Sequence, residues 1–157
     1  MKNYTFIGIS EKQSIELSED LNKLLANYQV YYQNLRGFHW NIKGDQFFEL
    51  HEKFEEYYND AQLKIDEIAE RILTLGGRPL HTFTAYLQAS SIPEVKDADD
   101  AKTCVSAVLD NLKTLLELER EIMDKAGDLA DEGTSALMSD YIREQEKTTW
   151  MLAAYLS

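Results

Sequence analysis

Apolar residues recur every three or four positions along four long stretches of this chain, which is the period of an amphipathic α-helix. The first stretch covers about residues 11–40 and follows a capping box at 10–13. The second runs over 47–75 and stops at Gly76-Gly77-Arg78-Pro79, where glycine ends the helix and proline forbids its continuation. The third covers about 99–126. After an acidic turn over 127–133, we expect Thr134 to cap the fourth.

The connection between the second and third helices is long, covers residues 78–96 and contains Pro79 and Pro93. Within it, residues 82–87 predict a short helix, and strand signals are absent from the chain. Four long helices joined by short, long and short connections are typical of an all-α four-helix bundle with one long crossover connection. The length of 157 residues predicts that residues 1–157 form one domain.

The composition, 44% hydrophobic and 28% charged residues, is that of a soluble globular protein. No apolar run approaches the roughly 20 residues of a membrane span. The first residues lack the apolar core of a signal peptide, so we expect a cytoplasmic protein. The single cysteine, Cys104, excludes an internal disulfide, and its apolar neighbours predict a core position.

The charge balance limits the partners that the chain can bind. It has 16 basic residues against 28 acidic ones, a formal net charge of −12, and no basic cluster at either end. Sequence-independent binding of nucleic acid relies on Lys and Arg to neutralise phosphates. An acidic surface favours cations instead.

Two of the three histidines, His39 and His51, lie in the same region as a dense run of carboxylates. On a helical wheel at ~100° per residue, with His51 at zero, Glu55 lies at about 40°, Asp66 at about 60° and Glu70 at about 100°. These four residues share one stripe of the second helix, beside its apolar face. Imidazole and carboxylate ligands together suit Fe, Mn or Zn better than Ca or Mg, so the stripe is a candidate metal site.

Distance limits how that site can be built. His51 and Asp66 are separated by about 22 Å along a straight helix, too far to share one ion. Either the chain carries two separate half-sites, or the antiparallel helix of a second subunit brings its Asp66 and Glu70 to this His51 and Glu55. The alternative is that these acidic residues are ordinary solvent-exposed residues of the helix surface and bind no metal.

Five segments of the chain are similar to one known family. They are "FHWNIKG" (38–44), "FFELHEKFEE" (47–56), "DEIAERILTLGGRP" (66–79), "DKAGDLADEGT" (124–134) and "EKTTWMLAAYL" (146–156). Together they closely resemble the Dps family, the miniferritins named as DNA-binding proteins from starved cells, over almost the whole chain.

The resemblance implies a ferritin-like bundle that assembles into a hollow, tetrahedrally symmetric homododecamer. It implies oxidation of Fe(II), preferentially by hydrogen peroxide rather than O2, and storage of the ferric mineral inside. The implied two-iron centre lies at the two-fold interface, with His39, His51 and Glu55 from one subunit and Asp66 and Glu70 from its partner. Zn or Mn could replace iron there. The family commonly has Asp where this chain has Glu55.

The resemblance also implies an acidic pore through which iron enters, lined from the region of Asp124, Asp128, Asp131 and Glu132. Family members that bind DNA generally use Lys/Arg-rich tails, and this chain departs from them, so we do not expect direct DNA binding. A nucleoid-associated DNA-binding protein with secondary iron binding is the alternative function. A four-helix interaction module without a metal site is a third.

Overall fold

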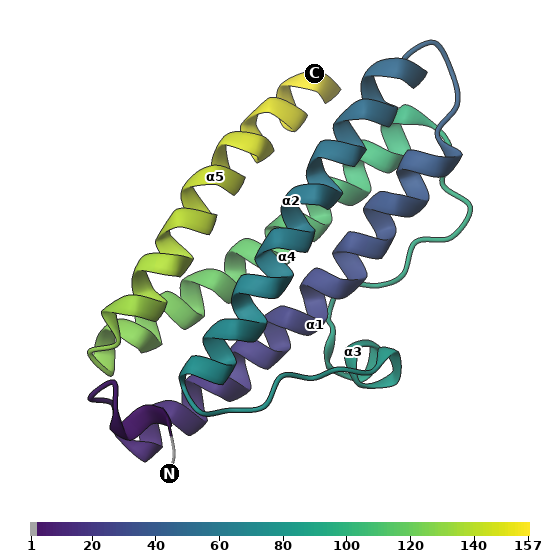
Figure 1. The fold of residues 1–157 in the computed structure, drawn as a ribbon. Helices are drawn as coiled ribbons and strands as arrows, with labels where there is room; N and C mark the ends of the chain where they lie inside the picture. Colours follow the sequence, from purple (N-terminus) through teal and green to yellow (C-terminus); the bar gives the residue numbers. More distant parts are fainter. Residues whose placement is uncertain (1–2) are drawn as a thin grey trace.

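The structure is a computed structural model that describes residues 3–157, and the described residues form helices and their connections, without strands. Its elements, in chain order, are η1 (Asn3–Thr5), α1 (Glu11–Asn41), α2 (Phe47–Thr74), α3 (Phe83–Ala89), α4 (Ala101–Asp128) and α5 (Glu132–Leu156). Helices α1 and α2 form one hairpin, helices α4 and α5 form a second, and the two hairpins pack together (Figure 1). This confirms the predicted four-helix bundle.

The connection between α2 and α4 crosses the length of the bundle, and the short helix α3 lies within it, beside α1 (Figure 1). Because the crossover runs from one end of the bundle to the other, α4 starts near the end at which α1 finishes. The backbone of Lys43, after α1, donates a hydrogen bond of 2.8 Å to the carbonyl of Asp99, before α4. The predicted crossover and its extra helix are confirmed.

The predicted signals at the start of α1 and the end of α2 act as expected. Ser10 and Gln13 form the complete capping box of α1. At the end of α2, Gly76 adopts a φ of 88°, and the amide of Gly77 donates to the carbonyl of Ile72 at 2.9 Å. A left-handed residue is the usual end of a helix, and glycine adopts it without steric penalty.

The turn between α4 and α5 differs from the prediction. Helix α4 continues through Gly127 and ends at Asp128, and Ala130, with a φ of 57°, supplies the left-handed residue. Asp131, not Thr134, is the N-cap of α5, because its carboxylate accepts the Thr134 amide hydrogen at 3.1 Å. The Thr134 hydroxyl in turn donates to Asp131 at 2.6 Å. The turn is therefore much shorter than the predicted span of 127–133.

The core lies between the four long helices and is built from side chains that are almost fully buried, among them Leu21, Phe54, Ile68 and Val108. Cys104 is fully buried there, as predicted, and burial raises the pKa of its thiol to about 11. None of the described helices has both the length and the apolar content needed to cross a membrane.

Candidate metal centre

His39, in the last turn of α1, and His51, in the first turns of α2, face each other across the first hairpin. Their rings are stacked, with centroids 3.8 Å apart and planes inclined by 15°. The Nδ1 atom of His39 lies 2.6 Å from the carbonyl oxygen of His51, and Nδ1 of His51 lies 2.7 Å from the carbonyl oxygen of His39. Each histidine thus binds the backbone of the other.

This reciprocal pair determines which nitrogen of each ring can bind a metal. A carbonyl oxygen only accepts hydrogen bonds, so Nδ1 must carry the hydrogen in both rings. In the neutral imidazole the lone pair is then on Nε2, the nitrogen that remains available to a cation. A backbone carbonyl on the second nitrogen is a common way in which proteins orient a metal-binding histidine. The pair is therefore preset for coordination through two Nε2 atoms.

Aromatic side chains hold both rings in place. Phe47 stacks on His51, with centroids 5.0 Å apart, and Tyr58 meets His39 edge-on at 5.3 Å. The ring of Tyr32 meets Tyr58 edge-on at 6.0 Å. His39 is buried and His51 is half-buried. The imidazoles consequently have little freedom to rotate, which lowers the entropy lost when they bind a metal.

The three carboxylates predicted as ligands, Glu55, Asp66 and Glu70, are all exposed on α2. None of them has an ion pair within the described residues. Other carboxylates of α2 do have partners in the same chain: Glu56 with Lys53, Asp60 with Lys64, and Glu67 with Tyr141. The three candidate ligands are therefore free to bind a cation that approaches from outside the bundle.

A single chain does not assemble the complete site. Among residues 3–157, no three histidine, cysteine or carboxylate side chains converge as they would around one metal ion. Of the five predicted ligands, the structure brings only His39 and His51 into contact. Asp66 and Glu70 lie about 22 Å further along the same helix than His51 and Glu55. Within one chain, the candidate ligands therefore form two separate groups.

The acidic residues assigned to a pore do not share one environment. Asp124, Asp128 and Glu132 are exposed around the turn between α4 and α5. Asp131 is buried, and Arg71 of α2 donates a hydrogen bond of 2.6 Å to its carboxylate. Since Asp131 also caps α5, its oxygens are already occupied, and it does not suit a pore lining.

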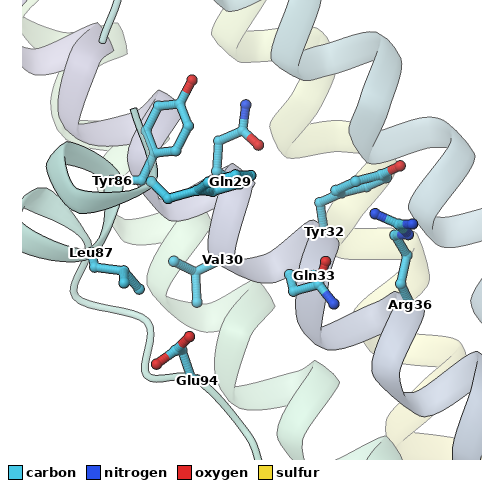
Figure 2. A pocket seen from close by; sticks show the side chains of 9 residues that line it. Gln29, Val30, Tyr32, Gln33, Arg36, Tyr86, Leu87 and Glu94 are labelled. Carbon is cyan, nitrogen blue, oxygen red and sulfur yellow. The ribbon is translucent and has the colours of Figure 1, made fainter. Parts of the chain in front are cut away.

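An apolar surface groove lies between α1 and α3 and has a volume of about 300 Å³ (Figure 2). Val30 and Tyr32 of α1 and Leu87 of α3 line it, and its lining contains one carboxylate, Glu94, and no histidine. The guanidinium of Arg36 at its edge lies 5.2 Å from the centroid of the Tyr32 ring. This chemistry does not suit a metal ion, so the groove is distinct from the candidate centre.

Helical periodicity did not identify a polar network inside the bundle. Tyr28 of α1 donates a hydrogen bond of 2.6 Å to Glu119 of α4, and Gln145 of α5 donates to the same carboxylate oxygen at 2.7 Å. Glu119 is fully buried, and this burial raises the pKa of its carboxyl from 4.5 to about 7. The only sequence signal is a Glu and a Gln on otherwise apolar helix faces.

Comparison with known proteins places these features in a family. A family model described as a ferritin-like domain matches residues 18–157. The chain is 46% identical to a DNA protection during starvation protein of Porphyromonas gingivalis, over 94% of this chain and 93% of that one. It is 53% identical to an uncharacterised protein of Haemophilus influenzae, over 96% and 94% of the two chains.

Solved structures agree with these relatives. The crystal structure of a Dps protein from Vibrio cholerae O1, described as a ferritin-like diiron-carboxylate protein, superposes with a TM-score of 0.95 at 58% identity, and covers 96% of this chain and 95% of its own. A Dps protein from Bacillus brevis superposes with a TM-score of 0.91 at 37% identity, over 95% of this chain and 100% of its own. The fold, the sequence and the histidine pair lead to one conclusion: the chain belongs to the Dps family of ferritin-like proteins.

Proposed function

We propose that this protein is a ferroxidase that oxidises Fe(II), preferentially with hydrogen peroxide, and stores the ferric product inside a hollow homododecamer. The observation that carries the proposal is the reciprocal His39–His51 pair, which leaves two Nε2 lone pairs available. The exposed carboxylate of Glu55 follows His51 by four residues on the same helix. Family membership supports an iron substrate.

The binding site is completed by a second subunit. His39, His51 and Glu55 supply one half, and Asp66 and Glu70 of the partner subunit supply the other. A two-fold axis that brings one such pair of half-sites together necessarily brings the second pair together as well, so each dimer holds two equal sites. This accounts for why ligands separated by about 22 Å within one chain act on the same iron.

The residues suit two Fe(II) ions as substrate. Nitrogen and carboxylate oxygen ligands bind Fe(II), and carboxylates also bind the harder Fe(III). Two Fe(II) ions give one electron each to hydrogen peroxide, its O–O bond breaks, and two protons are taken up to form two water molecules. Because the electrons are transferred as a pair, no hydroxyl radical is released, and the reaction protects the cell from oxidative damage.

Iron reaches the interior through an acidic pore in this proposal. The exposed residues Asp124, Asp128 and Glu132 at the turn between α4 and α5 are the candidates, and Asp131 is left out because it is buried. Repeated around a three-fold axis, such carboxylates would raise the local concentration of cations.

Anaerobic titration of the metal-free protein with Fe(II), followed by stoichiometric hydrogen peroxide and, in a parallel sample, by O2, tests the function. We expect saturable Fe(II) binding and an absorbance rise from ferric products that is faster with peroxide. A variant with His39→Ala and His51→Ala should lose the fast phase. Oxidation no faster than that of Fe(II) in buffer alone would contradict the proposal.

A further inference from the structure

Helix α2 carries three large apolar side chains that are exposed in the single chain. The exposed fractions are 79% for Phe48, 67% for Leu63 and 51% for Leu73. On the wheel that places His51 at zero, they lie at about 60°, 120° and 40°. These positions fall on the same stripe as the candidate ligands. Large apolar side chains on the same side of the helix as the candidate ligands are suited to an interface that also buries those ligands.

The candidate ligands on α2 are arranged symmetrically about the middle of the helix, which lies between residues 60 and 61. His51 and Glu70 are equidistant from that point, and so are Glu55 and Asp66. One antiparallel register of two α2 helices therefore aligns His51 with Glu70 and Glu55 with Asp66 in both directions at once.

Phe48 and Leu73 are equidistant from the same point. We infer that in the dimer Phe48 packs against Leu73 of the partner subunit, and that this apolar pair, formed twice, sets the register that completes both metal sites. The inference rests on the proposed shared site and names the contact that aligns it.

The surface of α2 is hollowed near the middle of the helix. A surface hollow of about 570 Å³ lies there, lined by Asn59, Gln62, Leu63, Ile65 and Asp66. In the inferred register, position 63 of one helix faces position 58 of the other, so Leu63 of the partner subunit reaches Tyr58. The ring of Tyr58 meets His39 edge-on at 5.3 Å, so this contact would cover the histidine pair as well.

The contact between Phe48 and Leu73 of the partner subunit covers the other side of the metal site. Phe48 lies beside Phe47, with ring centroids 5.3 Å apart, and Phe47 stacks on His51. Packing Leu73 of the partner subunit on Phe48 thus places apolar surface at the end of the site next to His51. Excluding water there strengthens the attraction between cations and the carboxylates.

Cysteine cross-linking tests the register. In a Cys104→Ala background, the double variant Phe48→Cys/Leu73→Cys should form a disulfide-linked dimer of twice the 18.1 kDa chain on mild oxidation. The two positions are about 37 Å apart within one helix, whereas a disulfide requires Cα atoms within about 7 Å, so the link must join two subunits. Each single-cysteine variant is the matched control and should stay monomeric on a denaturing gel.

Charge substitution gives an independent reading. Phe48→Lys or Leu73→Glu alone should weaken the dimer, whereas the two together should restore it, because each lysine then faces a glutamate of the partner. Phe48→Lys/Leu73→Lys is the control and should not be restored. Light scattering measures association, and circular dichroism checks that each variant is still helical.

The outcomes separate this inference from the proposed function. Absence of the cross-link, or restoration of the dimer by the like-charged control, would overturn the register even if iron oxidation were intact. A cross-link that forms in the double variant, together with an unsubstituted protein that does not oxidise Fe(II), would support the register and contradict the ferroxidase.

Discussion

Glu119 is a buried acid whose protonation depends on its surroundings. Its side chain is fully buried, one carboxylate oxygen accepts hydrogen bonds from Tyr28 and Gln145, and the other has no partner in the described structure. The cations whose charge acts on this carboxyl are Lys64 of α2 and Arg120 of α4. Burial dominates, so the pKa of the carboxyl rises to about 7. A buried carboxylate without full compensation is unfavourable.

The stability of the folded chain should therefore decrease as pH rises through the range from about 4.5 to about 7. In that window the folded state holds a proton at Glu119 that the unfolded state has already released, so raising the pH favours unfolding. Glu119→Gln imitates the protonated acid and should remove this contribution, which is roughly 3 kcal/mol at pH 8. Thermal unfolding at pH 5.5 and pH 8 measures it.

Glu117→Gln, an exposed change on the same helix, is the control and should leave the pH dependence of the wild type in place. The new amide of Glu119→Gln can also donate to the Gln145 side-chain oxygen, which has no partner in the described structure. A Glu119→Gln variant that is less stable than the wild type at pH 8 would show that the charged form is the one that the fold needs.

Hydrogen bonds from Arg71 link the end of helix α2 to the start of helix α5. Arg71 donates hydrogen bonds to Asp131 at 2.6 Å and to Thr134 at 2.9 Å. Gly133 lies so close that a Cβ there would be 2.8 Å from the guanidinium. These contacts of Arg71 fix the position of the C-terminal part of α2, which carries Asp66 and Glu70.

Arg71→Met should destabilise the protein by about 3 kcal/mol, because it leaves the buried carboxylate of Asp131 without its cation. Arg143→Met, which breaks an exposed i,i+3 pair with Asp140, should change stability by less than about 1 kcal/mol. Chemical denaturation measures the loss of stability in both variants. Losses of equal size would contradict a structural role for the contacts between Arg71 and Asp131.

The helices themselves were predictable because the period of apolar residues is a local property of the sequence. The end of α2 was predictable for the same reason, since Gly76, Gly77 and Pro79 act within one turn. The start of α5 was not, because the interaction that buries Asp131 comes from Arg71, 60 positions away. Local chemistry favoured Thr134, and the tertiary contact selected Asp131.

The candidate site likewise has features that could be predicted from the sequence and features that could not. Helical spacing predicted that His51 and Glu55 share a stripe of the second helix. The exchange of Nδ1–carbonyl hydrogen bonds was not predictable, because it depends on where two backbones meet. The convergence of Asp66 and Glu70 with the histidines stays a prediction, since a single chain cannot test it.

At the scale of the whole molecule, surface charge governs partners. The chain carries a formal charge of −12, and an assembly of many copies multiplies it. Because binding to DNA depends on neutralising phosphates, the protein should leave the mobility of plasmid DNA unchanged at ~0.15 M salt without divalent ions. A gel shift under these conditions would contradict the inference that the negative charge of the protein prevents DNA binding.

In the proposed cage, the same charge should guide iron to the interior. Asp124→Asn/Asp128→Asn should slow iron uptake, and the effect should be larger at low salt, where charges act over longer distances. Asp110→Asn/Glu117→Gln removes two exposed carboxylates of the same helix away from the turn and is the control. Uptake that is slowed equally in both variants would argue for net charge rather than a pore.

Subunit mixing tests the shared centre most directly. One variant carries His39→Ala and His51→Ala, the other Asp66→Ala and Glu70→Ala, and each alone should assemble without fast Fe(II) oxidation. In a mixed two-fold pair, one site receives both damaged halves, whereas the other receives intact histidines and Glu55 from one subunit and intact Asp66 and Glu70 from its partner. Random mixing should restore about a quarter of the wild-type sites. If one chain supplied every ligand, all sites would be damaged, and verified mixed cages that regain no activity would contradict the intersubunit site.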